Sequence, residues 1–398
     1  KKKKRKNTRT MSSEPVLDLL RDLIAYPTVS NRPVDAIVQT LAERAEDAGG
    51  QVSVLESGPG KSNIVARFGP PHSDGLVLSG HMDVVPTDGQ DWDSDPFQMT
   101  VRGDHLYGRG TADMKGFIAA ATTALQRLPV SKLERELVLI WTHDEEVGCR
   151  GSRILAEKWK AKLDPFPEMA WIGEPTDFRI CRMHPGHTTI EVRCIGRAAH
   201  SSRPGLGTNA ISLARIALEA LDRLSNAWEQ DRKFTAHLEC PFTVMNVGMI
   251  NGGTAVNIVP DHCTFQVGIR PLPGEPEQQR IDEIREALAP IQNQAIRMGG
   301  QISVATLQIA PALLTPEGTA LEALLCPHAS EPKPTAAPFA TDGGNLSILN
   351  MKSLVFGPGS IDVAHRPNEY IPAQDLIQCV DTIERVVRQR CLPSQSGA

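Results

Sequence analysis

A histidine and an aspartate stand two residues apart directly after an apolar run. The segment Ser79–Pro86 contains His81 and Asp83, and the preceding run Gly75–Ser79 has the pattern of a buried strand. If the strand geometry continues, the two side chains point to one face. A metal-binding histidine usually has a carboxylate or carbonyl on its second ring nitrogen, which fixes its orientation. We therefore predict that His81 binds a metal and that Asp83 orients it. A strand-end turn with incidental polar residues is the alternative.

Three consecutive acids follow a second apolar run. Asp144, Glu145 and Glu146 come shortly after Leu137–Trp141. Adjacent carboxylates repel each other, and burying them is costly unless a cation offsets their charge. In a two-metal hydrolase one carboxylate binds metal while another takes a proton from water. The cluster therefore favours a metal-dependent hydrolytic site over the alternative, a solvated acidic turn.

Three further polar residues occupy turns or loop ends. Asp113 ends the glycine-rich loop Tyr107–Gly116, Glu174 follows the apolar run Met169–Ile172, and His365 follows a rigid turn near the C-terminus. The loop could cradle a phosphate, but it lacks the P-loop spacing and Asp113 would repel an anion. We interpret Asp113 either as a metal ligand or as a helix N-cap. Each of these three positions is weak when taken alone.

The combined set has the composition of a catalytic metal site. Two imidazoles with three or four carboxylates suit borderline divalent metals such as zinc, cobalt or manganese. The sequence contains no clustered cysteines, which a structural zinc site would use. The predicted site therefore consists of His81, Asp113, Glu145, Glu146, Glu174 and His365.

The segments that must position these residues alternate between apolar runs and helical patterns. Continuous apolar runs suit strands buried on both faces of a mostly parallel sheet with helices on both sides. From about His187 the pattern changes to strands of alternating polarity, which are typical of a half-exposed antiparallel sheet. The sequence therefore predicts an α/β fold with a mostly parallel-sheet catalytic domain and an inserted α+β domain. The expected bounds are residues 13–186 and 312–398 for the catalytic domain, 187–311 for the insertion, and 1–12 for a disordered tail. A localisation or anion-binding signal is the alternative for the tail.

Composition limits what else the chain can be. Its 398 residues are enough for two domains, and a net charge of -5 with 5% aromatic residues argues against nucleic-acid binding. No apolar run reaches the roughly 20 residues that span a bilayer, and no apolar signal segment follows the basic Lys1–Arg5. The scattered cysteines favour free thiols in the cytoplasm. Cys149 lies near the acidic cluster, which should raise its pKa and make it a poor nucleophile.

Taken together and in this order, the motifs resemble those of a known family from about Val16 onward. This is the family of dinuclear zinc hydrolases that contains acetylornithine deacetylase, succinyl-diaminopimelate desuccinylase, aminoacylase and carboxypeptidase G. The segments Gly110–Phe117 and Gly173–Thr176 are most similar to acetylornithine deacetylase. The resemblance implies two divalent metal ions, zinc with cobalt as a substitute, and an amide substrate.

The resemblance also assigns the ligands. It implies that His81 and Glu174 bind one metal, that Glu146 and His365 bind the other, and that Asp113 bridges the two. It further implies a cis peptide bond directly after the bridging aspartate. All of these residues are present at matching positions.

Catalytic and substrate-contacting residues are implied as well. Glu145 would be the general base and later the proton donor, and Asp83 would orient the first histidine. His200 of the inserted domain would stabilise the oxyanion in the partner subunit of a homodimer. The remaining implied substrate contacts are Asn257, Arg270, Gly343 and Gly344. From the residues alone, His200 could instead cap a helix and Arg270 could be a surface charge.

The implied function is removal of an acyl group from an N-acyl-L-amino acid. The most similar reaction converts N2-acetyl-L-ornithine to L-ornithine and acetate in arginine biosynthesis. A di- or carboxypeptidase, or a desuccinylase of the same fold, is the alternative. A binding protein that has lost catalysis is a third hypothesis, which the complete ligand set disfavours. We expect a small-molecule substrate, a cytoplasmic homodimer, and neither a nucleic-acid nor a membrane partner.

Overall fold

The computed structural model divides the chain into two compact units and describes residues 14–71, 74–162, 164–232 and 237–393. The first unit comprises Lys1–Arg182, Thr315–Thr335 and Thr341–Ala398, and the second comprises Met183–Leu314 and Ala336–Ala340. The short segment Ala336–Ala340 lies outside the predicted insertion at 187–311. The predicted tail at residues 1–12 lies outside the described part of the chain.

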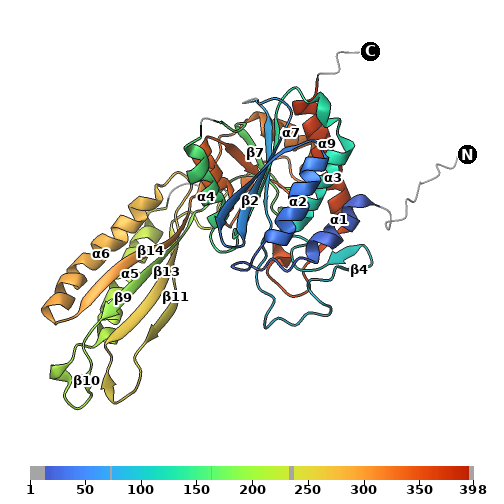
Figure 1. The fold of residues 1–398 in the computed structure, drawn as a ribbon. Helices are drawn as coiled ribbons and strands as arrows, with labels where there is room; N and C mark the ends of the chain where they lie inside the picture. Colours follow the sequence, from blue (N-terminus) through green and yellow to red (C-terminus); the bar gives the residue numbers. More distant parts are fainter. Residues whose placement is uncertain (1–13, 72–73, 163, 233–236, 394–398) are drawn as a thin grey trace, which may run out of the picture. The chain divides into compact units, whose positions relative to one another are not determined.

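A large mixed sheet contains the central strands of the first unit, while its strand at Leu313–Leu314 falls within the bounds of the second unit (Figure 1). Its strands are β1 (Gln51–Gly58), β2 (Lys61–Phe68), β3 (Leu76–His81), β6 (Leu137–Thr142), β7 (Met169–Ile172), β8 (Cys181–His184), β15 (Leu313–Leu314), β16 (Thr335–Ala336) and β17 (Lys352–Val355). The order is β1-β2-β6-β3-β7-β17-β8-β15, with β16 paired to β8.

The four central strands β6, β3, β7 and β17 are parallel, whereas the pairs β1-β2, β2-β6, β17-β8 and β8-β15 are antiparallel. The α/β prediction is confirmed, with the parallel part at the centre of the sheet. The pair β1-β2 is antiparallel because only a tight turn joins the two strands, and parallel neighbours need a long crossover.

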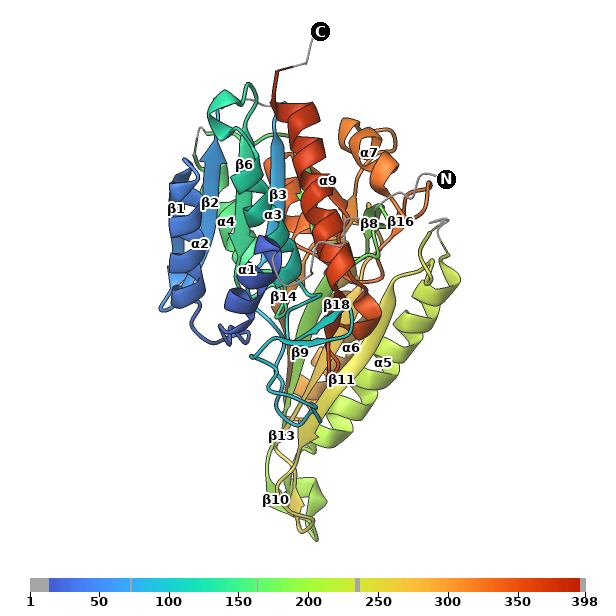
Figure 2. The same ribbon diagram turned by 90° about the vertical axis from the view of Figure 1, so that its right-hand side faces the viewer.

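The central strands are buried because helices cover both faces of the sheet. Every residue of β3 and β6 is buried. Figure 2 shows α1 (Pro15–Ile24), α2 (Asp35–Asp47), α3 (Lys115–Arg127) and α9 (Ala373–Cys391) in front of the strands. The helix α4 (Arg150–Lys160) lies on the other face, and α7 (Ala320–Leu325) and α8 (Gly343–Leu346) are short. Continuous apolar runs are the pattern that such two-sided burial requires.

A second, small sheet of the first unit was not predicted. It has the order β18-β5-β4, and its strands are β4 (Thr100–Arg102), β5 (His105–Tyr107) and β18 (Tyr370–Pro372). Because β18 pairs with β5, the chain just after His365 lies beside the chain that leads to Asp113.

The second unit contains a four-stranded antiparallel sheet of order β11-β13-β9-β14. Its strands are β9 (His187–Ile195), β11 (Val244–Gly252), β13 (His262–Arg270) and β14 (Gln301–Ala310). The helices α5 (Ala210–Gln230) and α6 (Glu277–Arg297) pack against one face (Figure 1). Alternate residues of β9 and β13 are buried beneath these helices, as the alternating polarity predicts. A further two-stranded pair joins β10 (Ala199–His200) to β12 (Ile258–Val259).

Among the described residues, no helix combines the length and the apolar character that crossing a membrane requires.

Candidate metal centre

The carboxyl ends of three neighbouring parallel strands carry the first site residues. His81 is the last residue of β3, Glu145 and Glu146 follow β6, and Glu174 follows β7. These strands are adjacent in the order β6-β3-β7. Residues far apart in the sequence therefore meet at one edge of the sheet, where open α/β sheets place their sites.

Asp113 lies between the two predicted histidine ligands. Its Oδ1 is 2.9 Å from Nε2 of His81, and its Oδ2 is 3.3 Å from Nε2 of His365. Each oxygen of one buried carboxylate thus faces a different imidazole, which is the arrangement that a bridging ligand needs. The peptide bond Asp113–Met114 is cis, so that expectation is confirmed.

The remaining acids divide between the two histidines. Oε2 of Glu146 is 3.0 Å from Nε2 of His365, and Oε1 of Glu174 is 3.8 Å from Nε2 of His81. Glu145 is also close, with Oε2 4.0 Å from Nε2 of His81. Each histidine thus lies near the acid with which the resemblance pairs it, but a carboxylate oxygen of Glu146 also lies within 4.8 Å of a ring nitrogen of His81. The assignment of ligands to two ions stays a prediction.

Charge repulsion and burial dominate the electrostatics of this cluster. Burial raises the pKa values of Glu145 and Glu174, and neighbouring carboxylates add to the rise. Burial, together with the charge of Asp113, raises the pKa of Glu146 to about 7. Buried acids that disfavour their own ionisation are stabilised when divalent cations lie among them. The donor set therefore fits a pair of divalent metal ions.

The contacts of Asp113 with the two histidines shift the pKa values of Asp113 and His365 in opposite directions. Burial by itself would raise the pKa of Asp113, but hydrogen bonds from His365 and His81 lower it well below its usual range. Hydrogen bonds with Asp113 and Glu146 raise the pKa of His365 to about 10. Asp113 thus ionises more readily than Glu145, Glu146 and Glu174.

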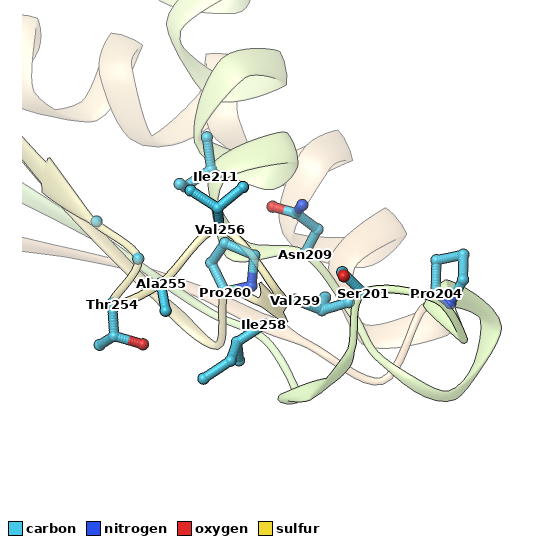
Figure 3. A pocket seen from close by; sticks show the side chains of 12 residues that line it. Ser201, Pro204, Asn209, Ile211, Thr254, Ala255, Val256, Ile258, Val259 and Pro260 are labelled. Carbon is cyan, nitrogen blue, oxygen red and sulfur yellow. The ribbon is translucent and has the colours of Figure 1, made fainter.

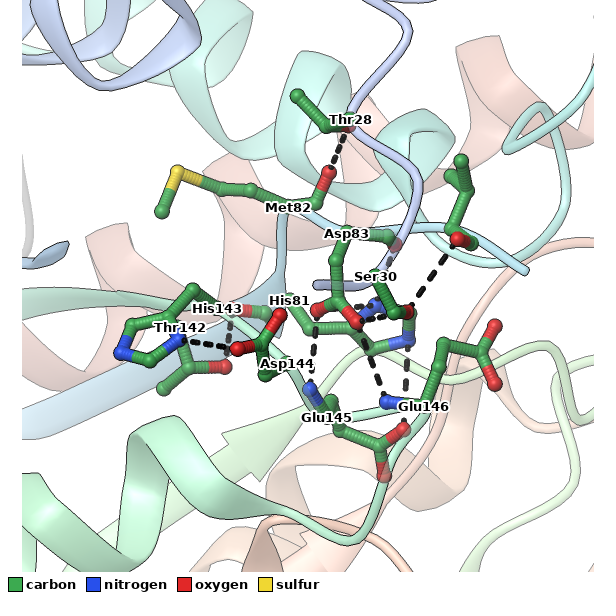
Figure 4. A network of polar contacts seen from close by, with 12 residues as sticks. Thr28, Ser30, His81, Met82, Asp83, Thr142, His143, Asp144, Glu145 and Glu146 are labelled. Atoms are coloured by element: carbon green, nitrogen blue, oxygen red, sulfur yellow. Dashed lines mark hydrogen bonds and ion pairs between the residues drawn. The ribbon is translucent and has the colours of Figure 1, made fainter. Parts of the chain in front are cut away.

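Asp83 has a different contact pattern from the expected one. Its main-chain carbonyl lies 2.9 Å from Nδ1 of His81, whereas its carboxylate oxygen Oδ1 is 3.7 Å away. The carboxylate instead accepts hydrogen bonds from the main-chain N–H groups of Glu145 and Glu146 and from the hydroxyl of Ser30 (Figure 4). The strand β3 ends at His81, so the side-chain alternation on which the expectation depended does not reach Asp83.

Cys149 is buried beside the acidic cluster and donates a hydrogen bond to Oε1 of Glu145 at 3.3 Å. Its pKa is raised well above the usual value, first by burial and then by the charge of Glu145. The direction agrees with the sequence-based expectation, but the main cause is burial.

One acid near the site was missed from the sequence. Asp342 is buried, accepts a hydrogen bond from Oγ1 of Thr142 at 2.5 Å, and has a carboxylate oxygen within 4.8 Å of the ligand atoms of Glu145 and Cys149. It directly precedes Gly343 and Gly344, which are buried at the start of α8. The signal was available, because the sequence motif that holds these glycines also contains the aspartate.

The predicted residues of the inserted domain occupy two separate places in the second unit. His200 is exposed at the end of β10, and the main-chain carbonyl of Asn257 accepts a hydrogen bond from the N–H of Ser201. A hollow of about 640 Å³ lies next to them, lined by the segments drawn in Figure 3. Arg270 is at the far end of β13, where it lines a different cavity of about 120 Å³ with Phe242. The unit therefore brings His200 and Asn257 together and separates them from Arg270.

Comparisons with known proteins identify the family of the chain. The sequence model of Peptidase family M20/M25/M40 matches residues 77–389. The acetylornithine deacetylase of Proteus mirabilis is 33% identical over 389 residues, covering 96% of this chain and 98% of that protein. The acetylornithine deacetylase of Pectobacterium atrosepticum is 34% identical over 391 residues, covering 96% of this chain and 99% of that protein.

Solved structures share the fold at lower identity. A tripeptidase from Staphylococcus aureus superposes with a TM-score of 0.75 at 20% identity, covering 94% of this chain and 97% of that one. An M20 family metallo-carboxypeptidase from Sulfolobus solfataricus gives a TM-score of 0.75 at 18% identity, covering 94% and 99%. The fold and the site define a metal-dependent hydrolase. The chain belongs to Peptidase family M20/M25/M40 and acts on amide bonds.

Proposed function

We propose that the protein hydrolyses the acetyl amide bond of N2-acetyl-L-ornithine and releases L-ornithine and acetate, as a step of arginine biosynthesis. The observation that carries the proposal is the placement of the Asp113 carboxylate between His81 and His365, with Glu145 alongside. The choice of substrate is supported by relatives named acetylornithine deacetylase, which match about the whole chain at 33% and 34% identity.

The proposed cofactors are two divalent metal ions, with zinc as the native metal and cobalt as a substitute. His81 and Glu174 would hold one ion, Glu146 and His365 the other, and Asp113 both. When bound, the ions supply Lewis-acid chemistry, because they polarise the amide carbonyl and activate water. This assignment is supported by the distances within the cluster and by the mutual repulsion of its buried acids.

Glu145 would move the protons of the reaction. Its carboxylate takes a proton from the attacking water and later gives it to the nitrogen of the leaving amine. Burial and the neighbouring Glu174 raise its pKa, which favours a carboxyl that can hold the proton between the two steps. Asp83 fixes the main chain at Glu145, so that this carboxylate keeps its place beside His81.

The two units would have different roles. In our proposal the first unit is the catalytic domain, and the second unit is the lid and dimerisation domain of a homodimer. The edge strand β11 supports this role because Val247, Met249 and Ile250 expose apolar side chains there. An unpaired strand edge with apolar side chains is suited to pairing with another chain.

His200 would then act in the active site of the partner subunit, with Asn257 and Arg270 as further substrate contacts. Gly343 and Gly344 of the first unit would offer main-chain contacts to the substrate carboxylate. A cytoplasmic location remains a prediction from the cysteine pattern.

The substrate is tested by measuring free amine released from N2-acetyl-L-ornithine, from other N-acetyl-L-amino acids, from N-succinyl-diaminopimelate and from a dipeptide panel. All assays use protein loaded with zinc or with cobalt. We expect the highest kcat/KM with N2-acetyl-L-ornithine. A higher kcat/KM with dipeptides would favour the peptidase alternative, and a higher value with the succinylated substrate would favour a desuccinylase.

A further inference from the structure

A buried carboxylate outside the predicted site holds the loop that ends at Asp113. The two oxygens of Glu369 accept hydrogen bonds from three main-chain N–H groups, those of Gly110 (3.0 Å), Ala112 (2.9 Å) and Asp113 (3.1 Å). Gly110 has a φ of 89°, a conformation that favours glycine. The side chain of Glu369 is only 1% exposed, so water does not compete for these donors.

Arg109 pairs with the carboxylate of Glu369 and also contacts a second loop, the one that carries His365. Its Nη1 donates to Oε2 of Glu369 at 2.8 Å and to the main-chain carbonyl of Arg366 at 3.3 Å. Its Nη2 donates to Oε1 of Gln90 at 2.6 Å, and Nε2 of Gln90 donates to the main-chain carbonyl of His365 at 3.0 Å. The side chain of Arg109 is 1% exposed, so the central contacts of this hydrogen-bonded connection are shielded from solvent.

These contacts join two loops that carry different parts of the metal centre. Asp113 belongs to the loop that Glu369 holds, and His365 belongs to the loop that Arg109 and Gln90 hold. The side chains of Asp113 and His365 lie 3.3 Å apart. A displacement of either loop would therefore change the distance between these two proposed ligands. Groups that fix the ligands of a metal are often as necessary as the ligands, because the ions tolerate little displacement.

We propose that Glu369 and Arg109 are positioning residues, and that this buried pair, together with the contact of Gln90 with the His365 carbonyl, sets the distance between the proposed ligands Asp113 and His365. The proposal rests on the proposed function only in taking these two residues as metal ligands. Neither Glu369 nor Arg109 has a side-chain atom in contact with the ligand side chains in the hydrogen bonds described above, so their effect acts through the main chain.

The test replaces Glu369 by Gln and measures metal binding directly. A glutamine offers one acceptor oxygen and an NH2 group that would face the same N–H donors, so it cannot satisfy all of them. Zinc affinity and stoichiometry are measured by competition with a chelator, and the visible absorption of the cobalt-loaded protein reports ligand geometry. We expect Glu369→Gln to bind at least one ion about 10- to 100-fold more weakly and to change the cobalt spectrum.

The matched control is Glu136→Gln. Glu136 is 1% exposed and pairs with Arg67 at 2.7 Å, in the same unit, but it precedes β6, whereas the site follows the other end of that strand. A purely structural role predicts that both variants lower the melting temperature of the metal-free protein and leave zinc affinity unchanged. Equal loss of zinc affinity in both variants, or wild-type affinity and spectrum in Glu369→Gln, would overturn the proposal.

A milder variant covers the case in which Glu369→Gln does not fold. Gln90→Ala removes the link to the carbonyl of His365 and leaves the Arg109–Glu369 pair in place. We expect it to fold, to weaken the binding of one ion, and to alter the cobalt spectrum less than Glu369→Gln; unchanged affinity and spectrum would count against the proposal. Wild-type protein that binds two ions but does not cleave N-acetyl amino acids would refute the proposed function, while the comparison of metal affinities would still decide the role of Glu369.

Discussion

The main-chain carbonyl of Asp83 lies 2.9 Å from Nδ1 of His81, and the Asp83 carboxylate binds elsewhere. One residue thereby fixes the site in two ways. Its carbonyl orients the imidazole of the ligand, and its carboxylate accepts the N–H groups of Glu145 and Glu146. The proposed base and one proposed ligand are therefore positioned by the same buried side chain.

We predict that Asp83→Asn lowers kcat and leaves His81 in place. The asparagine keeps the main-chain carbonyl but has one acceptor oxygen for two N–H groups, so the loop at Glu145 loosens. Loss of such a supporting contact typically costs about 10- to 100-fold. Steady-state kinetics at saturating metal measures it. Ser30→Ala is the control, because it removes a hydroxyl from the same carboxylate without touching the loop, and it should cost less. An equal or larger loss in Ser30→Ala would contradict this division of roles.

Glu145→Gln should abolish turnover while both metal ions stay bound. The amide cannot accept the proton from water, and general base catalysis contributes roughly 10²- to 10⁴-fold. Kinetics and metal analysis of the same preparation measure the two properties together. The neighbouring Cys149→Ala is the control, since a buried thiol of raised pKa is a poor nucleophile and its loss should leave kcat close to wild type. Near-full activity in Glu145→Gln would show that another group is the base.

The sequence was sufficient to predict which residues would meet at the candidate site. His81, Glu146 and Glu174 follow apolar runs, and the carboxyl ends of adjacent parallel strands must meet at one edge. The sequence could not predict the partner of the Asp83 carboxylate, because that depends on β3 ending at His81.

The small sheet β18-β5-β4 was missed for a related reason. Its strands have three residues each, too short for a periodic pattern to appear. Without that sheet the proximity of Glu369 to the loop of Asp113 is not visible in the sequence. The resemblance to a family supplied the expectations of the cis peptide bond and of the ligand pairing, which no local pattern indicates. The structure has the cis bond, and the ligand pairing stays a prediction.

Removing the metal ions should destroy activity and lower stability together. The ligands bind metal only when the chain is folded, so bound ions stabilise the native state by mass action. A single ion at about 100 times its Kd contributes about 2.7 kcal/mol. Chelation followed by a thermal unfolding scan measures the loss, and adding zinc, cobalt or manganese should restore both the melting temperature and the activity. Protein dialysed without chelator is the control. Full activity after complete removal of metal would refute the metal-dependent mechanism.

The second unit should lose stability as the pH falls below neutrality because of His184. Burial, with the nearby charge of Arg270 acting in the same direction, lowers the pKa of His184 to about 4. The unfolded chain takes up the proton near pH 6.5 and the folded chain only near pH 4, so the unfolded state binds more protons between these values. The stabilising contribution is therefore complete above about pH 6.5 and falls progressively toward about pH 4, and about 2 kcal/mol of it has been lost at about pH 5.

His184→Gln tests this pH dependence, because glutamine does not titrate. Urea unfolding of both proteins at pH 7.5 and at pH 5 gives the two free-energy differences, and the variant should lose about 2 kcal/mol less than wild type over this interval. His187→Gln is a useful comparison. Burial also lowers the pKa of His187 to about 4, but this side chain is partly exposed, so a smaller effect is expected. Identical losses in wild type and His184→Gln would show that this histidine does not contribute.

Met249→Lys should convert the proposed homodimer to a monomer. Met249 is 55% exposed on the edge strand β11, and a lysine there places a charge where a partner strand would pair. Leu307→Lys is the matched control, because Leu307 is 48% exposed on the other edge strand, β14. Light scattering coupled to gel filtration measures the mass, and the activity assay follows the same fractions. We expect the β11 variant to be monomeric and nearly inactive, since His200 would no longer reach a partner's site, and the β14 variant to stay dimeric and active. A fully active Met249→Lys monomer would exclude the contribution of His200 from a partner subunit.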